Sequence, residues 1–115
     1  MADKRMIVEI GMGTDLTGAD YTKAAIRALR DALWHNSLTV ADAVGQKVQA
    51  MKVRIIVGVP KPEQVDKAAV AAVLPYGSAT VEVVEGGLEI MNDAGTNLTL
   101  MANAAAIVYL DIAEK

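Results

Sequence analysis

The feature that most constrains the fold is a glycine-bearing junction between a short apolar run and a long amphipathic segment. The apolar run spans residues 6–10 and leads into Gly11, and Gly13 and Gly18 follow inside the junction. From Tyr21 onward, apolar residues recur with the period of an α-helix, in which successive residues advance by about 100°. This order predicts a strand, a turn that uses glycine, and one long helix.

The predicted helix has two distinct faces. The apolar face, which would seat the helix on a sheet, consists of Tyr21, Ala25, Ala28, Leu29, Ala32 and Leu33. The opposite face carries Lys23, Arg27, Arg30 and Trp34. Asp20 is predicted to cap the amino end by accepting bonds from the first free amides, with Thr17 as a second candidate. The periodic pattern ends at residues 36–37.

Composition favours a single α/β domain. A chain of 115 residues can bury a core, and since it has no Phe and no Cys, that core must consist of aliphatic residues and Met. The absence of Cys also excludes disulfides, thiol nucleophiles and zinc–thiolate sites. A net charge of −3 argues against general nucleic-acid binding. No secretory segment or membrane-spanning apolar run occurs, so we expect a cytoplasmic protein with no nucleic-acid or membrane partner.

The middle of the chain predicts a second strand and a second helix. Residues 39–49 are predicted to form a short irregular helix or turn, and residues 52–59 alternate as a strand does. Pro60 ends this strand, and Pro62 is suited to the first position of a helix that runs to about Val73.

The last third of the chain predicts three more strands. Residues 79–85 and 88–91 are predicted to form an antiparallel hairpin, because Gly86-Gly87 tolerates the positive φ of a tight turn. After a loop at residues 92–97, residues 98–112 favour one long bent strand, although their alanine cluster also allows a helix.

The predicted class is therefore α/β (an α+β sandwich), in the order β-α-β-α-β-β-β, with a mixed sheet and two helices on one face. The other face is predicted to mix charged and large apolar residues: Ile7, Glu9, Arg54, Ile56, Glu82, Val84, Glu89 and Met91. Large apolar side chains exposed in one patch indicate contact with another subunit, as does the exposed Trp34. We therefore expect a homo-oligomer.

The glycine-bearing junction is the first candidate site. Its backbone amides and the positive end of the helix dipole can hold a carboxylate or phosphate. Its glycine spacing matches neither a dinucleotide-binding nor a Walker loop, so a turn that simply needs positive φ is the alternative. The predicted ligand-binding residues are Gly11, Gly13, Thr14, Asp15, Gly18, Asp20 and Arg27.

Other candidate residues have an equally good structural explanation. Two carboxylates in the junction can bind a hard cation, but capping and turn formation explain them as well, so we predict no metal and no cofactor. The stripe of Lys23, Arg27 and Arg30 can clamp an acidic group or simply form the solvated face of the helix. His35 is the natural general base, yet Ser37 diverges from it by roughly 200° on a helix.

Five segments together resemble a small bacterial family of conserved hypothetical proteins, the Lin family. They are residues 9–25, His35-Asn-Ser, Gly58-Val-Pro, Leu74-Pro-Tyr-Gly and Val84-Glu-Gly-Gly. The resemblance covers most of the chain, except for a departure between Ser37 and Met51. It implies no activity, because the family has none assigned.

A weaker similarity links the junction to one repeat of the ring-opening amidohydrolases, cyanuric acid hydrolase and barbiturase. Met12 stands where their loop G-K-T-E-G-N-G has lysine. The similarity implies that a single repeat assembles as a homo-oligomer, such as a trimer. It also implies a hydrolase of cyclic amides in which Lys23 activates Ser37 or Ser78 across a subunit boundary.

Three hypotheses about function follow. The first is a homo-oligomer that binds a small polar or anionic molecule at the junction, beside the Pro60 turn and near a subunit boundary. The loops after the first two strands should share one sheet edge, where open α/β sheets bind ligands. The second is the hydrolase, and the third is a purely structural oligomer.

Overall fold

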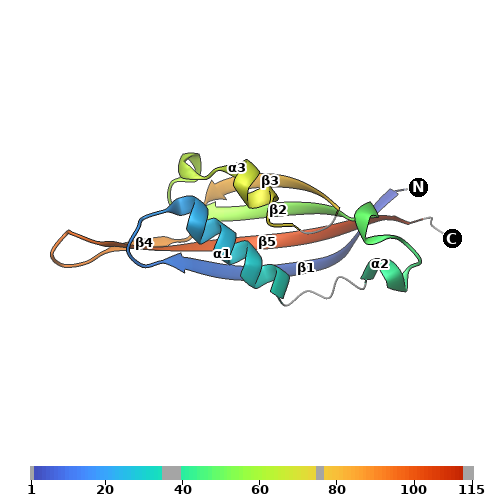
Figure 1. The fold of residues 1–115 in the computed structure, drawn as a ribbon, viewed down its shortest axis with the longest axis horizontal. Coiled ribbons are helices and arrows are strands. Elements are labelled where there is room, and N and C mark those ends of the chain that lie inside the picture. Colours follow the sequence, from blue (N-terminus) through green and yellow to red (C-terminus); the bar gives the residue numbers. More distant parts are fainter. Residues whose placement is uncertain (1, 35–39, 75–76, 113–115) are drawn as a thin grey trace.

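The computed structural model describes residues 2–34, 40–74 and 77–112 (Figure 1). The strands of its one sheet are β1 (Ala2–Asp15), β2 (Lys52–Val59), β3 (Ser78–Glu85), β4 (Leu88–Met91) and β5 (Leu98–Ile112). The helices are α1 (Tyr21–Trp34), α2 (Val40–Ala43) and α3 (Lys67–Ala71), with short 3₁₀ turns at Val48–Ala50 and Pro62–Gln64. A mixed five-stranded sheet with α1 and α3 on one side confirms the predicted class.

The strand order is β1-β5-β2-β3, with β4 also paired to β5. Both β1 and β2 run antiparallel to β5, and β3 runs parallel to β2. The carboxyl ends of β1, β2 and β3 therefore meet at one edge of the sheet (Figure 1). The prediction that the loops after the first two strands share an edge is confirmed.

The predicted hairpin between β3 and β4 is wrong. β4 pairs antiparallel with β5, where Leu88 lies opposite Met101, so β3 and β4 run in the same direction. Gly86-Gly87 lets the chain step across the end of β2 instead. There the Gly86 amide donates to the Val59 carbonyl at 3.0 Å, and Gly87 has a φ of +63°. A chain that crosses the end of a strand and a chain that makes a tight hairpin turn both need this glycine pair. The local sequence therefore could not distinguish the two structures.

β4 and the start of β5 form a two-stranded arm that extends past the helices (Figure 1). The molecule measures 61 × 22 × 20 Å, and its radius of gyration is 15.8 Å. A compact chain of this length would have a radius of gyration of about 13 Å. The arm carries large apolar residues, yet Leu88 and Ile90 are 58% and 61% exposed.

The core lies between the sheet and α1 with α3. The predicted inner face of β2 is confirmed, since Val53, Ile55, Val57 and Val59 are all buried. The buried residues of α1 are Tyr21, Ala24, Ala25, Ala28, Leu29 and Ala32. This set matches the predicted apolar face, with Ala24 added and Leu33 only partly buried.

Gly11 and Gly13 lie inside β1, which continues to Asp15 beyond its predicted end at residue 10. A Cβ atom on Gly11 would lie 2.3 Å from the amide nitrogen of Ala32, and one on Gly13 would lie 2.3 Å from that of Ala28. Both contacts are with the backbone of α1. These glycines therefore let the helix backbone rest directly on the strand, and the connecting loop is only residues 16–20.

The second predicted helix, residues 62–73, is divided in the structure. The 3₁₀ turn Pro62–Gln64 ends before α3 begins at Lys67. Between them, the Asp66 carboxylate accepts hydrogen bonds from the amides of Ala68 at 3.1 Å and Ala69 at 3.2 Å. Asp66 therefore acts as a helix cap, and caps favour a fresh helix start over an interior position.

The face of the sheet opposite the helices, called the open face below, differs in part from the prediction. Residues paired across a ladder share a face, and β1 has a register irregularity between Arg5 and Ile7. The open face therefore carries Val8, Ile10 and Met12 in place of Ile7 and Glu9, and Leu88 and Ile90 in place of Glu89 and Met91. Arg54, Ile56, Glu82 and Val84 lie on it as predicted. A shift of one residue moves every side chain of a strand to the other face.

None of the helices in the described part of the chain is long and apolar enough to cross a bilayer.

We predict that Gly13→Ala lowers the free energy of unfolding by about 3 kcal/mol, because the new methyl group meets the backbone of α1. Urea denaturation followed by circular dichroism measures this change. The control is Gly95→Ala, where a Cβ meets nothing within 4 Å and only the φ of +72° opposes the substitution. We expect a loss of about 1 kcal/mol there. Equal losses in the two variants would contradict the close approach of helix and strand.

Candidate functional site

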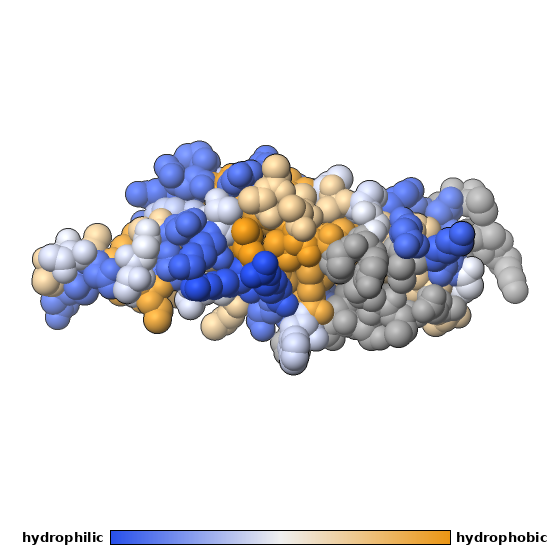
Figure 2. Space-filling model, viewed as in Figure 1, coloured by the Kyte–Doolittle hydropathy of each residue, from blue (hydrophilic) through white to orange (hydrophobic). Residues whose placement is uncertain are grey.

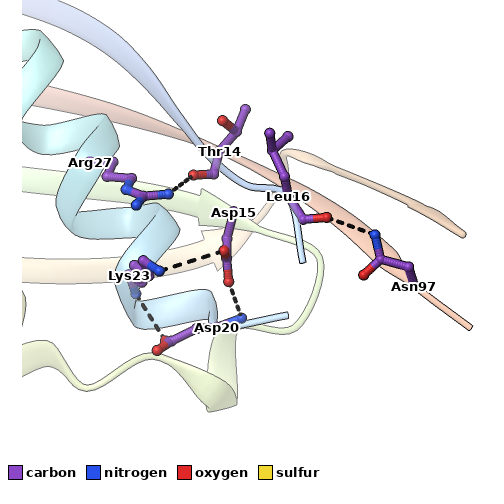
Figure 3. Close-up of polar contacts among 7 residues, drawn as sticks. All are labelled: Thr14, Asp15, Leu16, Asp20, Lys23, Arg27 and Asn97. Carbon is purple, nitrogen blue, oxygen red and sulfur yellow. Dashed lines mark hydrogen bonds and ion pairs between the residues drawn. The ribbon is translucent and has the colours of Figure 1, made fainter. Parts of the chain in front are cut away.

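The loop after β1 is built around the carboxylate of Asp15, which is only 3% exposed. Its Oδ2 atom accepts a hydrogen bond from the Asp20 amide at 2.8 Å (Figure 3). This bond holds the pKa of Asp15 below its ordinary value, although burial opposes the effect. The positive charge of Lys23 and the amides of Gly18 and Thr17 lower the pKa further. Asp15 is therefore ionised and bound by its own loop.

This arrangement bears directly on the predicted anion site. The sequence suggests that amides of the junction bind an external anion, but in the structure amides of this loop already meet the carboxylate of Asp15. Gly18 lies close against that group, since a Cβ there would be 2.9 Å from Asp15 Oδ2. An external anion near this loop would therefore have to be bound by side chains.

The amino end of α1 lies beside the loop. The Asp20 Oδ1 atom accepts a bond from the Lys23 amide at 3.0 Å, which confirms Asp20 as the helix cap. The Lys23 ammonium lies 3.9 Å from Asp15 Oδ1 (Figure 3). The Lys23 side chain is 51% exposed, whereas that of Asp15 is 4% exposed, so the lysine stands between a buried carboxylate and solvent.

Two further side chains of α1 bind the outer edge of β1. Arg27 Nη1 donates to the Thr14 carbonyl at 2.7 Å (Figure 3), and Asp31 Oδ2 accepts from the Met12 amide at 3.0 Å. The edge of a sheet exposes unpaired backbone groups, and side chains that satisfy them block pairing with other strands. Arg27 therefore has a structural role next to its predicted ligand-binding role.

A shallow groove of about 360 Å³ runs along the exposed side of α1. It is lined by Asp20, Thr22, Lys23, Ile26, Arg27 and Arg30. With Lys23 balanced by Asp15, two arginines and one aspartate remain, which gives a local charge of +1 on a chain whose net charge is −3. Figure 2 shows this side of the molecule, with hydrophilic residues gathered over α1.

The base of the arm is attached to this region by two hydrogen bonds that the sequence does not reveal. The Tyr21 hydroxyl donates to Glu89 Oε2 at 2.6 Å. Asn97 Nδ2 donates to the Leu16 carbonyl at 3.0 Å (Figure 3). The bond to the Glu89 carboxylate, together with burial and the nearby negative charges, raises the pKa of Tyr21 to about 12. The two residues of each bond are far apart in the sequence, by 68 positions in the first bond and 81 in the second. No local pattern could therefore predict either bond.

The predicted catalytic residues are not brought together within the described chain. Ser78 belongs to the same row of the sheet as Lys52 and Tyr109, whereas Asp15, beside Lys23, lies opposite Leu100. Nine residues of β5 separate these rows, which corresponds to about 30 Å. Ser37 and His35 lie outside the described residues. Across residues 2–34, 40–74 and 77–112, no three His, Asp or Glu side chains gather as metal ligands would.

We predict that Asp15→Asn lowers stability by about 2 kcal/mol at neutral pH, because an amide cannot accept every bond that the carboxylate accepts. The folded pKa of Asp15 lies below its unfolded value of about 3.9. Its contribution is thus complete above that value and is lost as the pH falls through the folded pKa. Thermal unfolding across acidic pH should therefore show a steeper decline for the wild type than for the variant. Asp93→Asn, in the exposed loop of the arm, should change neither quantity.

We also predict that Tyr21→Phe destabilises the protein by about 2 kcal/mol at neutral pH by removing the bond to Glu89. Because the folded pKa of Tyr21 lies above its ordinary value of 10.0, its contribution is present below about pH 10 and is lost as the pH rises through about 12. Denaturation at neutral and alkaline pH measures both effects. Identical curves for the variant and the wild type would contradict the anchoring role of Tyr21.

Comparisons with known proteins place this geometry in a family. The chain is similar to the crystal structure of an FtsZ-like protein of unknown function from Nostoc punctiforme, with 38% sequence identity and a TM-score of 0.87. The alignment covers 97% of this chain and 99% of that one. None of the functionally curated proteins matches the chain.

The family itself is identified from the sequence. The weaker similarity to the ring-opening amidohydrolases is shown neither by the matching family model nor by this solved structure. The model of the conserved hypothetical protein family Lin0512 matches residues 5–108. The resemblance to the Lin family is thereby confirmed, and the chain belongs to the Lin0512 family of conserved hypothetical proteins.

Proposed function

We propose that the protein binds a small molecule with a carboxylate or phosphate group in the groove along α1, and that it does so as a homo-oligomer. One observation carries the ligand proposal. Three cationic side chains, Lys23, Arg27 and Arg30, line one groove on a chain that is acidic overall. Such a local excess of positive charge attracts anions and not cations.

The two arginines supply the recognition chemistry. Arg30 is exposed and has no hydrogen-bond or ion-pair partner in the described part of the chain. Arg27 uses Nη1 for the Thr14 carbonyl, and its remaining donors can reach a ligand. A guanidinium group binds both oxygens of a carboxylate or phosphate through parallel hydrogen bonds. The groove therefore favours a planar or tetrahedral oxyanion.

The position of the groove agrees with this role. It lies beside the carboxyl end of β1, at the edge where β1, β2 and β3 all end and where open α/β sheets bind ligands. The first turn of α1 adds the positive end of the helix dipole. Because Asp15 already binds the loop amides, the loop supplies rigidity and the side chains of α1 supply binding.

The homo-oligomeric state is supported by the shape of the monomer. Its arm and its open face expose large apolar residues that a solitary chain would leave in water. The base of the arm is bonded to the start of α1 through Tyr21 and Glu89. A subunit boundary along the arm would therefore lie near the proposed groove.

Isothermal titration calorimetry at low ionic strength tests the ligand proposal, with inorganic phosphate and citrate as probes. We expect Arg30→Gln to weaken binding about tenfold, the loss expected for one charge-assisted hydrogen bond. Raising the salt concentration should weaken binding in the wild type. The control is Lys67→Gln on α3, which removes the same charge outside the groove. If neither probe binds the wild type, or if the two variants bind alike, the proposal is wrong.

A further inference from the structure

The open face of the sheet carries a continuous apolar surface. Six of its large residues are between 45% and 69% exposed: Val8, Ile10, Met12, Val84, Leu88 and Ile90. The ladder places them in neighbouring rows, since Ile10 lies opposite Ala105, which lies opposite Ile56, and Met12 is in the row of Asn103 and Gly58. Both α1 and α3 lie on the other face. A soluble monomer seldom exposes so many large apolar residues in one patch.

We propose that a second copy of the chain packs on this open face, with the two sheets face to face and related by a two-fold axis. The inference rests on the homo-oligomeric part of the proposed function and names the surface that forms the subunit boundary. It is independent of whether the groove along α1 binds an anion.

The charges on the open face favour a second copy as the occupant. The charged residues that the ladder register assigns to this face are Asp3, Arg5, Lys52, Arg54, Glu82 and Asp111, three positive and three negative, so their sum is zero. Glu85 belongs to a row of the other face, although it lines one end of the hollow described below. Two pairs already neutralise one another within the face: Lys52 with Asp3 at 3.0 Å, and Arg54 with Glu82 at 2.7 Å. Two copies can therefore meet without repulsion, whereas a strongly charged partner would find no complementary charge.

The area of the face is sufficient. The open face, with its apolar and polar residues together, is four strands wide and about 25 Å long, and with the arm it covers about 650 Å² at ordinary strand spacings. Stable interfaces bury about 600 to 1,000 Å² on each partner. Sheets that pack face to face are a common architecture, with side chains interdigitating between them.

The relief of the face is self-complementary. A hollow of about 280 Å³ lies between Ile10, Ile56 and Val84, because Gly58 and Ala105 in its lining have little or no side chain. Glu85 and Gly86, at the end of β3, also line it. Ile10 and Met12 stand beside it as a ridge, 69% and 58% exposed. A two-fold interface needs such a ridge and hollow on the same surface, so that each copy fills the other. The Asn103 amide in the hollow can both donate to and accept from its mate in the partner.

Light scattering coupled to size exclusion tests the proposal. The wild type should elute with about twice the chain mass of 12.1 kDa, or an even multiple of it. Ile10→Glu should reduce the mass to that of one chain, because a charge would be buried without a partner. The arm offers a matched pair at neighbouring positions. Ile90→Glu, on the open face, should weaken assembly, whereas Met91→Glu, on the helix-bearing face, should not.

Disulfide trapping gives a second measurement that does not depend on disruptive variants. The chain has no Cys, so a single introduced thiol reports its own neighbourhood. Asn103→Cys should form a covalent dimer on mild oxidation, and Trp34→Cys, on the exposed side of α1, should not. A monomeric wild type, an Ile10→Glu variant of unchanged mass, or equal trapping at both positions would overturn the proposal. Anion binding by a monomeric wild type would leave the groove proposal standing alone.

Discussion

The close contact between α1 and β1 positions the parts of the molecule that surround it. Gly11 and Gly13 remove the side chains that would hold the helix away from the strand, so backbone meets backbone. This approach brings Arg27 and Asp31 within reach of the strand edge, where they bond to Thr14 and Met12. The same contact fixes where α1 begins, and hence where the loop around Asp15 must close.

The loop after β1 uses the carboxylate of Asp15 to hold its own backbone in place. Asp15 is buried at the end of β1 and accepts amide hydrogen bonds from the chain that follows it. A buried carboxylate without such bonds would be strongly destabilising. Because the loop amides already bind Asp15, we propose that an external anion is bound by the cationic side chains along α1. The arm is held to the same region through Tyr21 and Asn97. Groove, loop and arm therefore form one connected unit.

A sheet covered on one face only leaves the other face to be explained. The core on the helix side combines the alanines of α1 with large buried side chains such as Leu29, Ile55 and Leu100, and large apolar residues also lie exposed on the open face. Its polar residues lie mostly on β2 and β3, where Arg54 pairs with Glu82, while Lys52 on β2 pairs with Asp3 on β1. Its large apolar residues follow one another along β1 and continue onto the arm. This distribution resembles half of a buried core.

The local features of this protein can be predicted from the order of its residues. Helical period located α1 and its buried face, alternation located β2, and a cap residue located the start of α1, because these signals depend on near neighbours in the chain. Tertiary structure alone decided that β5 lies between β1 and β2, that Gly86-Gly87 crosses a strand end, and which face of β1 is open. It also decided that the Asp15 carboxylate accepts hydrogen bonds from amides of its own loop and that the Tyr21 hydroxyl donates to Glu89. These features depend on pairing between segments that are distant in the sequence. A shift of one residue in strand register moves every side chain to the other face of the sheet, and the local sequence does not distinguish between many possible partners.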